Sequence, residues 1–366
     1  MLHEPATVGP AARGPDASPG SAGTARPWRS LLRWEGALLV LFVGALLYGG
    51  AETKEFFTQN TVFYFGNNIG EVAIMALPMA LIIITGEIDL SVASMLGLAA
   101  SVFGDLFSHG VEVWLAMAIV LLVGAAGGAL NGFLVTRIGL PSIAVTIGTL
   151  TMFRGLAEIV LGNREPTNFP AYLTKIGLVP FPGTKLSWIF VFFLVLAVVY
   201  AVVLHATPVG RSIFAIGLQE QAAFFSGIRV KRIKFRLFVL SGVVCAFVGL
   251  LDAFKNASVR YDAGTGLELN VVAVVLFGGI SIFGGRGTIG GVVLSVLVVG
   301  TINEALNLIN VTQEKQNIVF GVLLLVSVLL PNGADGFHRL RRRLKRSGRS
   351  TRSIGNQQYL PQEATQ

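Results

Sequence analysis

Apolar runs of about 20 residues, the length that an α-helix needs to cross a lipid bilayer, recur along almost the whole chain. Hydrophobic residues make up 53% of the 366 residues and charged residues only 13%, and the mean hydropathy is +0.70. Soluble globular proteins carry about twice that share of charged residues. The sequence therefore predicts an all-α fold, a polytopic transmembrane helical bundle.

The apolar runs predict about ten spans. We expect them at residues 34–50, 69–85, 90–108, 112–136, 141–162, 186–206, 235–256, 267–284, 287–309 and 315–330. An even number of spans places both termini on the same side of the membrane.

The distribution of basic residues predicts that this side is the cytoplasm. With the amino terminus inside, the inner segments collect 20 of the 28 Lys and Arg residues, and basic residues concentrate in cytoplasmic loops. The net charge of +8 belongs to the two tails. We expect these tails to lie against anionic membrane lipids and not to bind nucleic acid.

The distribution of apolar and basic residues divides the chain into three parts. Residues 1–30, rich in Ala, Gly, Pro and Ser, are predicted to be a disordered cytoplasmic tail. Residues 31–332 form the membrane domain, and residues 333–366 a basic cytoplasmic tail. Within the membrane domain, the polar loop 207–236 is longer than a simple connection, which favours a docking surface. Its charges could instead serve only to set the topology.

Two spans are interrupted by polar, glycine-containing turns, at residues 81–94 and 277–291. Irregular backbone at membrane depth is tolerated only where protein or a water-filled cavity covers it. Both turns are therefore predicted to face the bundle interior or its cytoplasmic mouth. Two interpretations of the first turn remain: Glu87 and Asp89 are functional, or Asp89 and Ser91 cap the next helix. For the second turn, close helix packing is favoured.

Other polar and small residues within the spans have structural interpretations. Arg154 and Glu158 lie four residues apart and are predicted to neutralise each other on one helix face. The small residues around Gly128 are predicted to let two helices approach closely. A lone Cys245 excludes an internal disulfide.

The sequence contains no motif for energy coupling or catalysis. It lacks a GxxxxGK[ST] phosphate-binding loop, an HExxH pair, a GxSxG elbow and a zinc-type Cys/His spacing. The chain is therefore predicted not to be an enzyme and to bind no metal. If it performs uphill transport, another polypeptide must supply the energy.

The segment ITGEIDLSVASMLGLAA resembles the ITGGIDLSVGS signature of bacterial ABC-importer permeases for monosaccharides, of the ribose, arabinose, xylose, rhamnose and autoinducer-2 group. The resemblance continues through LPSIAVTIGTLTMFRGLA, GRSIFAIGLQEQAAFFSGIRVKRIKFRLFVLSG and LELNVVAVVLFGGISIFGGRGTIGG. It runs from about residue 31 to residue 332.

This resemblance implies a permease subunit in the bacterial plasma membrane that translocates a monosaccharide, rhamnose or a similar sugar. The implied partners are a second permease subunit, identical or similar, a cytoplasmic ATPase that uses ATP and Mg, and an extracytoplasmic sugar-binding protein. The chain itself would bind no cofactor. The binding protein would dock on the outer loops at residues 163–185 and 256–268. Importers for nucleosides or branched-chain amino acids are the closest alternative. A secondary transporter or channel is a second alternative, but it would need an ion relay that the few buried charges do not form.

The resemblance also implies two sets of site residues. The segment that couples to the ATPase comprises Glu220, Ala222, Ala223, Phe224, Gly227, Ile228 and Arg229. The candidates for the pathway and its signature turns are Gly86, Glu87, Asp89, Ser91, Ser94, Gly284, Gly285 and Arg286. Glu87 departs from the signature, which has Gly there, and we expect it to strain the backbone if that Gly supplies a positive φ.

Overall fold

The computed structural model describes residues 27–312, 314–319, 321–322 and 325, and these residues form helices and loops without a β-strand. The elements are α1 (Pro27–Glu52), α2 (Gln59–Ile84), α3 (Val92–Ser108), α4 (Val113–Phe133), a π-helical turn η1 (Leu134–Ile138), α5 (Ser142–Leu161), α6 (Ala171–Leu178), α7 (Trp188–Ala206), α8 (Pro208–Leu218), α9 (Glu220–Phe225), α10 (Val230–Asn256), α11 (Leu267–Phe277) and α12 (Ile289–Leu308). The predicted tails, apart from residues 27–30 at the start of α1, lie outside the described residues.

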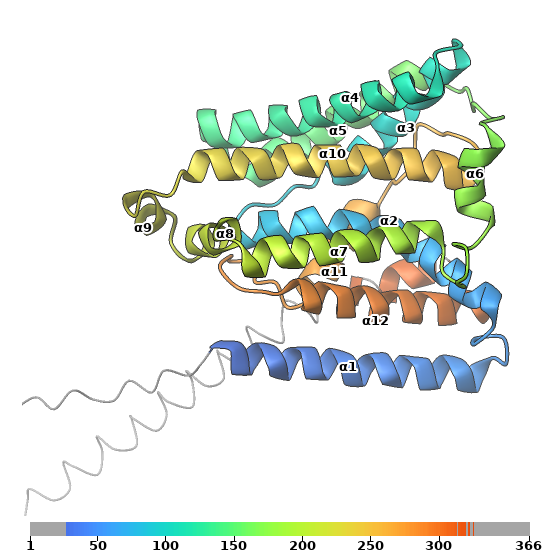
Figure 1. Cartoon of the computed structure of the whole chain (residues 1–366), viewed down its shortest axis with the longest axis horizontal. Helices are drawn as coiled ribbons and strands as arrows, with labels where there is room; N and C mark the ends of the chain where they lie inside the picture. Colours follow the sequence, from blue (N-terminus) through green and yellow to red (C-terminus); the bar gives the residue numbers. More distant parts are fainter. Residues whose placement is uncertain (1–26, 313, 320, 323–324, 326–366) are drawn as a thin grey trace, which may run out of the picture.

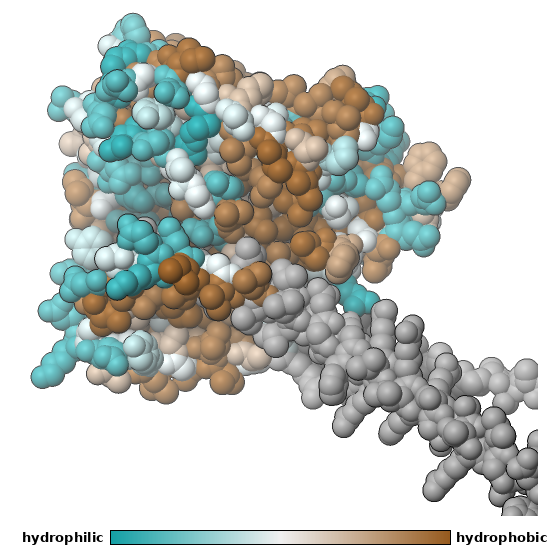
Figure 2. All heavy atoms as spheres, turned by 180° about the vertical axis from the view of Figure 1, so that it is seen from behind, coloured by the Kyte–Doolittle hydropathy of each residue, from teal (hydrophilic) through white to brown (hydrophobic). Residues whose placement is uncertain are grey.

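The long helices lie side by side with α1 at one edge and α4 at the other (Figure 1). We call the end of the bundle that carries α8 and α9 the α9 end, and the opposite end, which carries α6, the α6 end. Figure 2 shows an apolar band across the middle of one face, with polar residues gathered at both ends. This is the surface that a membrane-spanning bundle presents to lipid.

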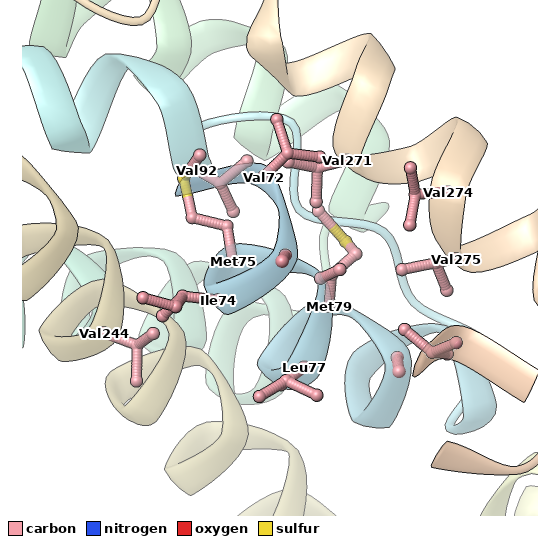
Figure 3. Packing of buried hydrophobic residues seen from close by; sticks show 14 of the residues in the cluster. Val72, Ile74, Met75, Leu77, Met79, Val92, Val244, Val271, Val274 and Val275 are labelled. Carbon is pink, nitrogen blue, oxygen red and sulfur yellow. The ribbon is translucent and has the colours of Figure 1, made fainter. Parts of the chain in front are cut away.

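Helix α2 is the centre of the bundle, and it contacts α7, α10, α11 and α12. Its side chains are almost all buried from Ile69 onward. Met75 and Met79 lie between valines of the surrounding helices (Figure 3). A helix that is apolar on all sides is suited to this position because each of its faces meets another helix.

Glycines on α4 allow α10 to approach closely, as the small-residue pattern predicts. A Cβ atom on Gly128 would overlap the carbonyl oxygen of Phe238, and one on Gly242 of α10 would overlap that of Gly124. The backbones of the two helices are therefore in direct contact, and the predicted role of this pattern in packing is confirmed.

Seven of the described helices are long and apolar enough to cross a membrane, namely α1, α2, α4 with η1, α5, α7, α10 and α12. The helical bundle is thus confirmed, whereas the number of ten spans is not. Helix α2 begins ten residues before its predicted start, and α11 ends at Phe277 and not at residue 284. The early end follows from Gly278 and Gly279, the latter with a φ of +84° that terminates the helix. Most of the expected last span lies outside the described residues.

The contact between α4 and α10 predicts an asymmetry between glycines. Gly128→Ala should lower the free energy of unfolding of the detergent-purified protein by about 1–3 kcal/mol, and with it the midpoint of thermal unfolding, because the methyl group has no space beside Phe238. Gly44→Ala on α1 is the matched control, since nothing lies within 4 Å of its Cβ position. Thermal unfolding followed by intrinsic fluorescence measures both, and an equal midpoint for the two variants would contradict this packing.

Candidate functional site

Three segments that are far apart in the sequence meet at the α9 end through their backbones. The amide of Gly285 donates a hydrogen bond to the carbonyl oxygen of Ile84, at 2.8 Å. A Cβ atom on Gly217 of α8 would overlap both groups, and Gly284 lies against Gly86. The two interrupted turns and α8 therefore form one closely packed joint in which three glycines leave no space for side chains.

A lysine joins the first turn to α9. The ammonium of Lys234 donates hydrogen bonds to Glu87 Oε1 and to Glu220 Oε2, both at 2.6 Å. The side chain of Lys234 is only 7% exposed, whereas those of Glu87 and Glu220 are 16% and 56% exposed. One buried cation thus bridges a signature residue and the first residue of the candidate coupling helix.

From the sequence, Lys234 is one of the basic residues of the loop 207–236 that are expected to meet acidic groups of the ATPase, and no partner within the chain is predicted for it. One face of α10 carries Val230, Lys234, Leu237 and Ser241 at helical intervals, and all four are buried. This spacing indicates that Lys234 lies on the buried face of the helix. A lysine on a buried helix face needs an acidic partner. Glu87 and Glu220, both among the candidate site residues, meet this requirement.

The expected backbone strain at Glu87 is not present. The positive φ of the turn, +84°, belongs to Gly86, and Glu87 is not among the residues with positive φ. The amides of Gly86 and Glu87 donate to the carbonyl oxygens of Ile83 and Ile82, at 2.9 and 3.2 Å. This is the Schellman arrangement, in which only the first residue after the helix cap needs the left-handed conformation. The condition for strain at Glu87 is therefore not met in this chain, because Gly86 supplies the left-handed conformation.

Asp89 lies at the centre of a buried polar network. Its Oδ1 accepts hydrogen bonds from the amide and hydroxyl of Ser91, at 3.0 and 2.6 Å, and its Oδ2 accepts one from the hydroxyl of Ser241, at 3.0 Å. Asn131 of α4 donates to the hydroxyl of Ser91, at 2.8 Å. The first turn is thereby connected to both α4 and α10.

The capping interpretation of this turn is wrong for Ser91. Ser91 is the N-cap residue of α3, but its side chain makes no bond to the first amides of that helix. Asp89 instead closes a local turn by accepting the amide of Ser91. Ser94 donates to the carbonyl oxygen of Ser91 and is buried within α3, whereas Arg286 is exposed at the α9 end.

The candidate coupling residues form a small structured protrusion. Ala223 is buried against Ile216 and Val230, and Gly227, with a φ of +83°, turns the chain after α9. Phe224 and Phe225 are 65% and 85% exposed. Ala222, Arg229, Lys231 and Arg232 are also exposed around them. Two exposed aromatic side chains beside basic residues are typical of a protein-binding surface.

Arg154 does not pair with Glu158. Its guanidinium Nη1 donates to the carbonyl oxygens of Tyr261 and Ala263, at 3.1 and 2.7 Å, and none of the ion pairs between described residues joins it to Glu158. The predicted pair was wrong because the loop at residues 257–266, distant in sequence, offers carbonyl groups that local spacing cannot reveal. This arginine fastens the loop to α5.

The two loops predicted to receive a binding protein lie together at the α6 end. Thr167 and Ser258 form an antiparallel bridge, and the amide of Val259 donates to the carbonyl oxygen of Pro166, at 3.1 Å. Hydrogen bonds from Arg260 lower the pKa of Asp262 within the second loop. The two loops are therefore joined, and their common surface carries polar residues together with the exposed side chains of Tyr172, Leu178 and Val179.

Comparisons with known proteins identify clear relatives. The family model described as "Branched-chain amino acid transport system / permease component" matches residues 62–328. The chain is 31% identical over 309 residues to the autoinducer 2 import system permease protein LsrD of Salmonella paratyphi A, which covers 83% of this chain and 92% of that protein. It is 35% identical over 290 residues to the ribose import permease protein RbsC of Escherichia coli, covering 76% and 88%. For the ribose import permease protein RbsC of Bacillus subtilis, the identity is 36% over 275 residues, covering 72% and 83%. No solved structure matches the chain.

The lysine bridge predicts unequal energetic coupling to its two partners. In a double-mutant cycle, Glu87→Gln and Lys234→Gln should couple by about 1–3 kcal/mol, because both groups are largely buried. Glu220→Gln and Lys234→Gln should couple by less than about 1 kcal/mol, because Glu220 is half exposed. Thermal unfolding of the purified single and double variants measures both cycles, and additive effects of the Glu87 pair would refute the bridge.

Proposed function

We infer the function of this chain from its family, since it belongs to the family of permease components described as the branched-chain amino acid transport system. We propose that it is the membrane-spanning subunit of an ATP-driven importer that carries a monosaccharide into a bacterial cell. The observation that supports this function best is the protrusion at the α9 end. It combines exposed aromatic side chains with a direct ionic connection, through Lys234, to the signature turn.

In this proposal the α9 end faces the cytoplasm and α9 docks on a separate ATPase, which uses ATP and Mg. Phe224 and Phe225 would enter an apolar recess of that subunit, and Arg229, Lys231 and Arg232 would meet acidic groups around it. The basic character of this end agrees with a cytoplasmic position.

Movement of α9 would reach the membrane interior through two rigid connections. Glu220 and Glu87 share Lys234, so that a shift of α9 displaces the turn between α2 and α3. Gly217 of α8 lies against both Ile84 and Gly285, so that the same shift displaces the turn before α12. Closely packed backbones transmit such a shift because they cannot deform independently.

The remaining partners follow from the same proposal. A second permease subunit completes the pathway, and an extracytoplasmic sugar-binding protein docks on the joined loops of the α6 end. The relatives are named for ribose and for autoinducer 2. We propose a monosaccharide substrate, rhamnose or a similar sugar, with nucleosides or branched-chain amino acids as the alternative.

Transport by the complete importer tests this function. The chain is produced together with its ATPase and binding protein, and uptake of radiolabelled L-rhamnose, D-ribose and L-leucine is measured in cells. We expect uptake of a sugar that stops when the ATPase is inactivated. Uptake that survives depletion of ATP and collapses with the membrane potential would instead identify a secondary transporter.

The protrusion predicts a specific loss of ATPase binding. Phe225→Ala should reduce the amount of ATPase that co-purifies with the chain by about tenfold, because an aromatic anchor contributes more than 1 kcal/mol to an interface. Phe57→Ala is the matched control, since Phe57 is 68% exposed and packs edge-on against a neighbouring phenylalanine, as Phe225 does. Equal co-purification of the two variants would exclude α9 as the docking element.

The buried network predicts that Asp89→Asn impairs uptake more than it impairs insertion of the chain into the membrane. The amide cannot accept all three hydrogen bonds that the carboxylate accepts, so the turn loses a fixed position. We expect about a tenfold loss of uptake, equivalent to one lost hydrogen bond to a charged group. Glu112→Gln is the control, because Glu112 is exposed and its side chain accepts only a backbone amide at the start of α4. Normal uptake at normal membrane levels would give Asp89 a purely structural role.

A further inference from the structure

A polar cavity lies among α2, α10, α11 and α12 near the α6 end, away from the joint at the α9 end. Its volume is about 230 Å³, enough for several water molecules or one small ligand. Four of its ten lining residues are asparagines, Asn68, Asn270, Asn303 and Asn307. Asn270 and Asn303 are partly buried, whereas Asn68 and Asn307 are exposed, so the amide side chains extend from the cavity wall to the surface.

Among these asparagines Asn303 retains unused hydrogen-bonding capacity, while Oδ1 of Asn307 already accepts a hydrogen bond from Nε2 of Gln316, at 2.6 Å. The Oδ1 atom of Asn303 is buried and has no partner among the described residues, whereas Asn68 donates to Glu304, at 3.2 Å. A buried polar atom without a partner costs about 1–3 kcal/mol. A ligand with hydroxyl groups would remove this cost, since a hydroxyl can donate to Oδ1 and accept from an amide NH₂.

The charge of the lining selects against charged ligands. Lys255 is the charged residue among the ten that line the cavity, and its ammonium is already paired with the carboxylate of Glu71. A zwitterionic amino acid would need a carboxylate for its ammonium group, and no Asp or Glu lines the cavity. The lining therefore suits a neutral molecule.

The rest of the lining is apolar and consists of Ile69, Val72, Leu267, Val274 and Val299. Binding sites for small molecules combine such walls with a few polar groups that set orientation. A sugar ring has C–H groups that pack against aliphatic side chains and hydroxyl groups that face amides. The two parts of the lining match these two kinds of surface.

We propose that this cavity is a binding site for a neutral monosaccharide during its passage through the protein. The inference rests on the proposed transport function and assigns the position where the sugar is held near the α6 end. Leu267, which lines the cavity, is the first residue of α11 and lies within the segment 256–268 that we propose as a docking surface. A sugar released at that surface would reach the asparagines first.

Uptake by the complete importer tests the site. Asn303→Ala and Asn270→Ala, both at residues that line the cavity, should each reduce uptake of the transported sugar by about tenfold, through loss of one or two hydrogen bonds, while the ATPase still co-purifies normally. Asn60→Ala is the matched control, because Asn60 is exposed near the same end and does not line the cavity. Normal uptake by both cavity variants would overturn the inference.

Chemical labelling supplies a second measurement that does not depend on turnover. The variant Asn307→Cys, in the complete complex in lipid nanodiscs, is treated with a maleimide, and the unsubstituted chain with its buried Cys245 gives the background. L-rhamnose or D-ribose should slow labelling severalfold, whereas L-leucine should not. Labelling that no sugar slows would show a water-filled cavity and overturn the site.

The experiments distinguish a failure of the proposed transport function from a failure of the proposed binding site. If the unsubstituted importer transports no sugar, the proposed function is wrong. If it transports a sugar and both cavity variants do so equally well, the function stands and the cavity is not the site. Slower labelling in the presence of L-leucine alone would assign the cavity to an amino acid and contradict the argument from charge.

Discussion

The structure depends on the requirement that every backbone polar group at membrane depth finds a partner within the protein. An unpaired group there costs several kcal/mol, and this chain interrupts two of its apolar segments. At the end of α2 the amides of Gly86 and Glu87 turn back to the helix, and the carbonyl oxygen of Ile84 accepts the amide of Gly285. Before α12, Thr288 accepts the amide of Gly291 and donates to Glu35 of α1. The interruptions are possible only because they cover each other.

The same requirement explains why charge is placed so sparingly. Lys234 is held by two carboxylates and Lys255 by Glu71, while Arg154 is satisfied by two carbonyl oxygens. Each buried cation therefore joins elements that are far apart in the sequence, because a buried charge must be paired. Glu87 illustrates the consequence: a carboxylate at a position where the related signature has glycine is accommodated by a lysine on another helix.

The two ends of the bundle differ in their chemistry. The α9 end presents exposed phenylalanines on a short helix, with exposed arginines at the start of α10 beside it, which suits a tight contact with another protein. The α6 end presents loops joined by a backbone bridge and, beneath them, a cavity lined by neutral amides. The central helix α2 extends between these ends, from Asn68 at the cavity to Ile84 at the joint. Helix α2, with Pro78 in its interior, thus connects the surface proposed to receive energy with the cavity proposed to receive the sugar.

The sequence by itself determined the helical bundle, the two interrupted segments and the glycines that let α4 and α10 touch, because each depends on local composition or helical spacing. It could not determine that Lys234 joins Glu87 to Glu220, that Arg154 binds the carbonyl oxygens of a distant loop, or that four asparagines from three helices share a cavity. It also left open which residue of the first turn takes the left-handed conformation; that residue is Gly86, since one residue of helix length decides which position follows the cap. These features were decided only by the tertiary structure, because the partners of a buried polar group are set by the packing of helices and not by their order along the chain.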